Sequence, residues 1–109
     1  MSNSIREGNM YAINAPGSRG HFAILVRVET PWLYFYDTID KVYFMTTVSD
    51  VKRAMKLHTQ IPMGRDDLRQ LPYLDLVETI PDKIWQPLKS YCDQVMRKKA
   101  IKHRNFIKS

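Results

Sequence analysis

The side chains of this chain most suited to chemistry are cations, and they gather at its C-terminal end. Residues 94–109 contain six Lys and Arg residues and no Asp or Glu. In residues 1–93, eleven Lys and Arg are balanced by eleven Asp and Glu, so the net charge of +6 comes entirely from the last sixteen residues. Cations clustered without acids form an electrostatic surface for phosphates. We therefore expect nucleic acid, DNA or RNA, to bind at Arg97, Lys98, Lys99, Lys102, Arg104 and Lys108.

Four further cations are expected to assist. Lys52, Arg53 and Lys56 share the solvated face of a predicted helix. Arg19 lies within Gly17-Ser18-Arg19-Gly20, which matches the GXXG pattern that clamps a nucleic-acid backbone in KH domains. That loop joins two helices in KH domains, whereas here it is expected to join two strands, which favours a plain glycine turn. A solvated tail and an acidic protein partner remain alternatives for the basic end.

An aromatic set on two predicted strands is the second candidate for binding. Exposed, it would stack on unpaired bases or anchor a protein partner. Alternatively, the C-terminal helix packs across this face and buries it, with Trp85 and Tyr91 as partners, and in so small a domain this is the favoured interpretation. The set comprises Trp32, Tyr34, Tyr36 and Tyr43.

Residues typical of catalysis or metal binding are scattered. The three His residues fall in different expected elements, at His21, His58 and His103. Asp37 and Asp40 lie in a predicted turn, where Asp is favoured for its local hydrogen bonds. The GxSxG, HExxH, GxGxxG and P-loop motifs are absent. We therefore expect no enzyme, no metal and no cofactor.

The single Cys92 excludes an internal disulfide and fits a reducing, cytoplasmic setting. No signal peptide is expected, because the N-terminus has no apolar core, and no apolar run is long enough to span a membrane.

Periodicity predicts one α+β domain, with antiparallel strands at 10–14, 21–29, 32–36, 42–48 and, less clearly, 74–80. In the second strand Ala23, Leu25 and Arg27 alternate to one face. Ser49 is expected to cap a short helix over 50–58. A long helix is expected to start between Ile84 and Pro87, because Pro is best tolerated in a first turn, and to run to about Arg104. The predicted fold is a four- or five-stranded SH3-like β-barrel or curled sheet with a short helix and a long C-terminal helix. Residues 1–96 form the neutral body and 97–109 the basic helix end and tail.

A strand opening with Gly-x-Met-Tyr, the strand HFAILVRV, a strand ending in Thr46-Thr47 and a final helix resemble, in outline, KOW-type SH3-like barrels and MazF/PemK ribonuclease toxins. The Arg-Pro that usually opens the second strand of those toxins has no counterpart at Gly20-His21-Phe22. Residue types alone, Thr46-Thr47 after a strand with Arg residues nearby, allow a metal-independent ribonuclease of a toxin type as a distant third alternative, with Arg19 and Thr47 as candidates. The first expectation is a small non-enzymatic regulatory protein that binds nucleic acid. The second is a protein-binding adaptor or inhibitor, of accessory or phage type, that acts on an acidic partner, and an open sheet edge would allow a homodimer.

Overall fold

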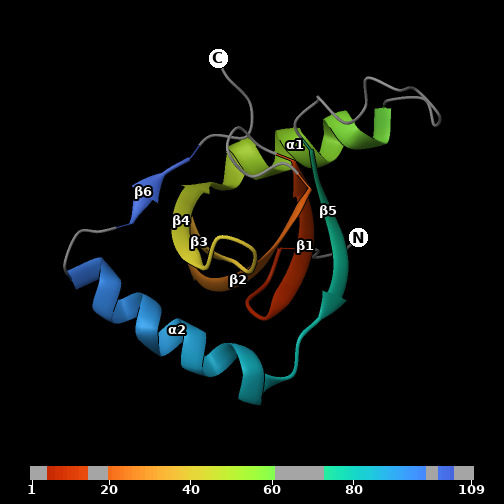
Figure 1. Cartoon of the computed structure of the whole chain (residues 1–109). Coiled ribbons are helices and arrows are strands. Elements are labelled where there is room, and N and C mark those ends of the chain that lie inside the picture. The colour runs from red at the N-terminus through yellow and green to blue at the C-terminus, as the bar shows by residue number, and fades with distance from the viewer. Residues whose placement is uncertain (1–4, 15–19, 61–72, 98–100, 105–109) are drawn as a thin grey trace.

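The computed structural model describes residues 5–14, 20–60, 73–97 and 101–104. Four strands are followed by a helix, a strand, a second helix and a short final strand (Figure 1). They are β1 (Asn9–Asn14), β2 (His21–Glu29), β3 (Trp32–Asp37), β4 (Val42–Thr47), α1 (Val48–Gln60), β5 (Tyr73–Thr79), α2 (Asp82–Arg97) and β6 (Lys102–His103). The α+β class is confirmed. In this part of the chain, no helix has the length and apolar character needed to cross a membrane.

The strands form one open sheet in the order β5-β1-β2-β3-β4-β6. The first five strands pair antiparallel, which confirms the strand prediction, including the fifth strand. The short β6 pairs parallel to β4 and was not predicted. The SH3-like barrel is not confirmed, because β5 and β6 are the two ends of the sheet and no pairing between described strands closes it. The sheet nevertheless curls, and α1 lies across its open side (Figure 1).

The concave side of the sheet carries the larger core. Aromatic rings at its centre pack on one another, with Phe35 stacked on Phe44 at 5.2 Å between ring centroids and Tyr11 edge-on to Phe35 at 5.9 Å. Val51 and Ala54 of α1 close this core, and both are buried. They lie three residues apart and therefore on one helix face. Burying that face is what holds α1 against β4 and β5.

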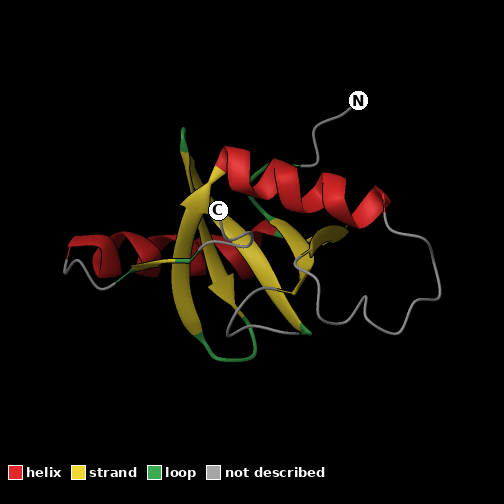
Figure 2. Ribbon diagram, turned by 90° about the horizontal axis from the view of Figure 1, so that it is seen from above, coloured by secondary structure: helices red, strands yellow, loops and turns green. Residues whose placement is uncertain are grey.

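The convex side is covered by α2, so the two helices lie on different sides of the strands (Figure 2). Trp85 and Cys92 are the buried helix residues, and Leu88 and Met96 are partly buried beside them. Leu88, Cys92 and Met96 lie four residues apart, so one face of α2 points to the sheet, as expected for an amphipathic helix, whereas Ile84 and Tyr91 are exposed.

The boundaries predicted for both helices were wrong. The C-terminal helix begins at Asp82 and ends at Arg97, so Pro87 lies inside it and the chain leaves the helix well before Arg104. The Pro81 carbonyl accepts the N–H groups of Ile84 and Trp85, which forms the first turn ahead of the proline. In α1 the cap is Thr47 rather than Ser49, because the Thr47 hydroxyl accepts the N–H of Asp50 at 3.2 Å.

The predicted alternation of β2 also fails at its middle. Leu25 pairs with Phe35 whereas Arg27 pairs with Tyr34, so Val26 is an extra residue and forms a β-bulge. An extra residue shifts everything after it to the opposite face of a strand. Arg27 consequently lies on the convex side with α2, not on the concave side with Ala23 and Leu25.

Candidate functional site

The outward face of α1 is cationic. The helix starts directly after β4, and its first turn is fixed by the Thr47 cap and by the buried Asp50, which accepts a hydrogen bond from the Thr46 hydroxyl at 2.9 Å. With Val51 and Ala54 turned into the core, the opposite face is exposed to solvent. The exposed cations on that face are the predicted Lys52, Arg53 and Lys56. Asp50 is the acid of this helix, and it is buried.

The structure brings the C-terminal segment to the same end of the sheet. In β6, Lys102 pairs with Phe44 and His103 with Met45, and the Arg104 N–H donates to the Met45 carbonyl at 2.8 Å. Because β6 is parallel to β4, the chain at residue 104 runs in the direction of Thr47 and the start of α1 (Figure 1). The described part of the C-terminal segment therefore lies along β4, the strand that leads into α1.

Arg104 has a role in the fold. Its guanidinium lies over the Phe44 ring, 4.8 Å from the centroid, and its Nη1 is 3.7 Å from Oδ2 of Asp37. The side chain is 23% exposed. We therefore assign Arg104 to packing β6 against the sheet, in place of the phosphate contact that the sequence suggested.

Asp37 is the centre of a polar cluster that the sequence did not reveal. Its Oδ1 accepts the N–H groups of Ile39 and Asp40, and its Oδ2 lies 2.8 Å from Nδ1 of His21. Burial raises the pKa of Asp37, but the hydrogen bond from His21 and those from the two N–H groups outweigh it, so the pKa lies below its usual value. Asp37 is charged and fully buried, and it holds together β2, the β3–β4 turn and β6. Sequence spacing alone cannot show that His21 and Asp37 pair, because β2–β3 register decides it.

A divalent metal is a poor fit to this cluster. The possible ligand atoms of His21, Asp37 and Asp40 lie within 4.8 Å of one another, and these residue types can coordinate a metal ion. However, the Asp37 oxygen that would bind the ion already faces His21 and the Arg104 guanidinium. A second cation there would be repelled by the guanidinium. We interpret the cluster as a set of contacts that stabilises the fold.

The aromatic set is covered by α2, as the favoured alternative predicted. Tyr34 is buried, and Trp32, Tyr36 and Tyr43 are partly buried in the convex core. The Tyr43 hydroxyl donates to the Leu88 carbonyl at 2.8 Å, and its ring stacks on Tyr91 at 5.8 Å between centroids. Burial, together with the neighbouring Cys92, Tyr36 and Tyr91, raises the pKa of Tyr43. The set is therefore mainly a docking surface for the helix, although Trp32 stands at its edge.

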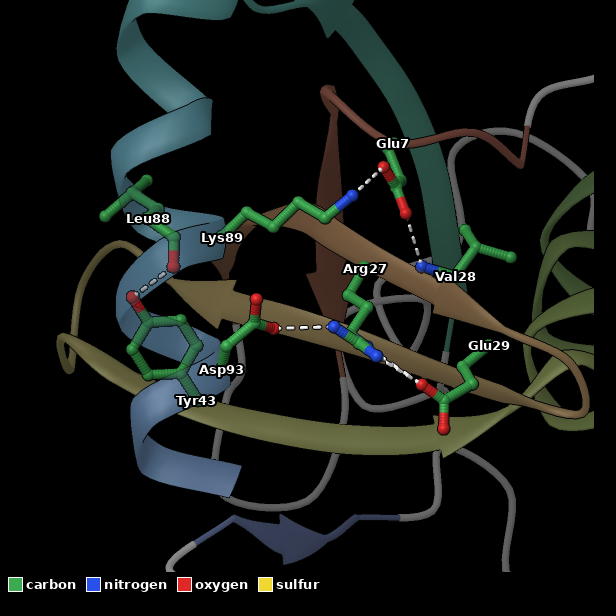
Figure 3. A network of polar contacts seen from close by, with 8 residues as sticks. All are labelled: Glu7, Arg27, Val28, Glu29, Tyr43, Leu88, Lys89 and Asp93. Carbon is green, nitrogen blue, oxygen red and sulfur yellow. Dashed lines mark hydrogen bonds and ion pairs between the residues drawn. The ribbon is translucent and has the colours of Figure 1, made fainter. Parts of the chain in front are cut away.

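Ion pairs fix α2 along its other flank (Figure 3). Lys89 lies 2.7 Å from Glu7, whose second oxygen accepts the Val28 N–H. Arg27 lies 2.6 Å from both Asp93 of the helix and Glu29 of its own strand. The bulge at Val26 makes this possible, because it turns Arg27 towards α2. No sequence signal marks such a bulge.

Several predicted residues cannot be placed. Arg19, Lys98, Lys99 and Lys108 lie outside the described residues, and the described backbone of Arg97 and Lys102 gives no side-chain position. Thr47, the candidate of the ribonuclease alternative, is engaged as the α1 cap. Searches with this chain among protein-family models, curated proteins and solved structures found no match.

Proposed function

We propose that this chain is a small non-enzymatic protein that binds nucleic acid at the end of the sheet where β4 leads into α1. The observation that carries the proposal is the exposed face of α1, the helix that follows β4 directly, with Lys52, Arg53 and Lys56. The sequence adds a second basic segment, residues 97–109, which contains six cations and no acid. The described part of that segment, residues 102–104, contacts β4.

Electrostatics support phosphate as the ligand of this surface, which we call the basic end. Among the described residues, Glu29 pairs with Arg27, and the buried Asp50 accepts the Thr46 hydroxyl and lies 3.9 Å from the Arg53 guanidinium. The amino terminus of α1 adds the positive end of its helix dipole, which favours anions. Lys and Arg on such a surface release the counterions of a phosphate backbone, so binding is expected to weaken steeply with salt.

A protein-binding adaptor or inhibitor is the second candidate, and one observation favours it. Tyr91 is 57% exposed and Ile84 is 50% exposed. Both lie on α2, seven residues apart and therefore on the same face of the helix. Exposed Tyr and apolar side chains on a fixed helix are common anchors for a protein partner. The partner would then dock on the convex side, away from α1.

The test is binding of fluorescein-labelled DNA and RNA oligonucleotides by anisotropy across a salt series. Exchange of Lys52 and Arg53 for Gln should weaken binding, and Lys83→Gln is the matched control, because Lys83 is an exposed cation on α2. Charge exchange is preferable to deleting residues 97–109, because Ile101 packs in the convex core and Arg104 contacts Asp37. An equal loss of affinity in the Lys52 and Arg53 variant and in the Lys83→Gln variant, or no binding at low salt, would refute the proposal.

A further inference from the structure

The apolar part of α2 is wider than the face that the sheet covers. Cys92 is buried in the convex core, whereas Ile84 and Tyr91 are exposed. Residues three, four and seven apart lie on one side of a helix, so Ile84, Leu88 and Tyr91 form one apolar row beside the docked face. The partly buried Val95 continues the row by one turn. We call these four residues the α2 edge.

The charged side chains that the structure describes on α2 lie away from this edge. Lys89 and Asp93 are on the opposite flank, where both are held in ion pairs (Figure 3), and Asp82 accepts a hydrogen bond from the buried indole. Lys83 lies about 100° round the helix from the edge. A phosphate backbone or a charged peptide would therefore find no counter-charge on the α2 edge, and the partner that fits is another neutral apolar surface.

Tyr91 is fixed in place before any partner binds. Its ring stacks on Tyr43 at 5.8 Å between centroids, and Tyr43 in turn donates its hydroxyl to the Leu88 carbonyl and contacts the Tyr36 ring. A ring that is already ordered loses little conformational entropy on binding, and Tyr is enriched among the residues that dominate interface energies. The exposed part of Tyr91 is thus suited to anchor a protein surface.

A second copy of this chain offers a surface of the required chemistry, because the α2 edge is neutral and apolar along its length. We propose that the chain forms a two-fold symmetric dimer in which the α2 helices pack antiparallel along the α2 edge. With the two-fold axis between Pro87 and Leu88, Ile84 of each copy meets Tyr91 of the other, as an isologous contact requires. Antiparallel packing also sets the positive end of each helix dipole beside the negative end of the other.

Salt distinguishes this contact from nucleic-acid binding. Each copy carries a net charge of +6, and the α2 edge itself contributes none of it. The two copies therefore repel one another only at longer range, and salt that screens this repulsion should strengthen the dimer. This inference does not depend on the proposed function, in which salt should weaken binding.

The test is sedimentation velocity of the full chain over a concentration series, after bound nucleic acid has been removed. The mass should rise with concentration from 12.9 kDa to twice that value, and more readily at high salt. Tyr91→Glu and Ile84→Lys should each weaken association by roughly 30-fold or more, because each brings charge into an apolar contact. Gln86→Glu is the matched control and should leave the dimer intact, because Gln86 is exposed on the opposite side of α2.

A mixture of the two variants tests the antiparallel register. In a heterodimer, the ammonium introduced at Ile84 of one chain faces the carboxylate introduced at Tyr91 of the other, and the second contact is native. Equal amounts of Ile84→Lys and Tyr91→Glu should therefore associate although neither does so alone, which also shows that both variants fold. A wild type that stays monomeric, a dimer that neither variant weakens, or a mixture that does not associate would overturn the inference. None of these results changes the proposed function, because the samples contain no nucleic acid.

Discussion

Gly8 lies directly before β1 and against Trp85 of α2, and it offers a direct test of how the helix packs on the sheet. Its φ is +92°, and a Cβ placed there would lie 2.6 Å from Nε1 and 2.9 Å from Cε2 of Trp85. The Trp85 indole is not free to move away, since it is buried and its N–H donates to Asp82 at 3.1 Å. The Gly8 backbone is also engaged, because its N–H donates to the Leu25 carbonyl and its carbonyl accepts the Ile80 N–H.

The expected cost of Gly8→Ala has two parts. A positive φ costs a residue with a Cβ about 1–2 kcal/mol, and forcing an extra methyl group into a packed site costs about 1–3 kcal/mol. The free energy of unfolding should therefore fall by about 2–5 kcal/mol. Gly20 provides the control, since its φ is +72° but a Cβ there would meet nothing within 4 Å. Gly20→Ala should cost only the backbone part, about 1–2 kcal/mol.

Urea unfolding followed by circular dichroism measures both costs. In a Trp85→Leu background the steric part should disappear, so the effect of Gly8→Ala should fall to that of Gly20→Ala. Equal costs for the two glycine variants in the wild-type background would refute the close packing of Trp85 on Gly8. The seating of α2 on the convex side would then need revision.

Three further predictions concern the contacts that hold the fold together. Exchange of Arg27 for Met and of Asp93 for Asn should show a coupling energy of about 0.5–1 kcal/mol in a double-mutant cycle, because the ion pair is partly exposed. High salt should reduce this coupling energy. Additive effects of the two exchanges would show that the ion pair does not contribute to stability. Asp37→Asn should lower the free energy of unfolding by about 2–4 kcal/mol at neutral pH. The pKa of Asp37 is lowered on folding, so the stabilisation by its carboxylate is present above the unfolded value of 3.8 and is lost as the pH falls below it. The stabilities of the variant and the wild type should therefore converge in acid. A difference between their urea midpoints that stays constant with pH would be evidence against this. Burial raises the pKa of the Cys92 thiol to about 11, and the charge of Asp93 adds to the effect. A thiol reagent should therefore label Cys92 only when the chain unfolds. Rapid labelling of the native chain would show that α2 does not cover this face.

Much of this fold could be predicted because its strands and helix faces follow simple periodicities. Leu33 and Phe35 alternate with Trp32, Tyr34 and Tyr36, and the structure places the two sets on opposite sides of the sheet. Leu88, Cys92 and Met96 likewise recur at helical spacing and lie on the docked face of α2.

The features that were missed depend on tertiary contacts. The bulge at Val26 is a matter of pairing register, and β6 is only two residues long, held through Ile101 in the convex core and Arg104 on Phe44 and Asp37. Pro87 predicts a helix start at Ile84 or later, because proline is best tolerated in a first turn. The helix begins earlier because the Pro81 carbonyl accepts the N–H groups of Ile84 and Trp85, which forms a turn ahead of the proline.

The candidate site divides in the same way. Charge counting identified both basic segments, because charge is a property of sequence alone. Only the structure shows that residues 102–104 lie along β4, the strand that leads into α1. The closeness of His103 to Trp32 follows from that same pairing.

The most direct test of the central claim is the salt dependence of oligonucleotide affinity, measured for the wild type and for a variant with Lys52 and Arg53 exchanged for Gln. A surface that binds phosphates predicts a linear fall of the logarithm of the association constant with the logarithm of salt concentration. For a single strand, each phosphate contact that is lost should reduce the slope by about 0.7, so the double exchange should reduce it by about 1.4. An affinity that does not respond to salt, or a slope that the exchange leaves unchanged, would contradict the claim that the basic end binds nucleic acid.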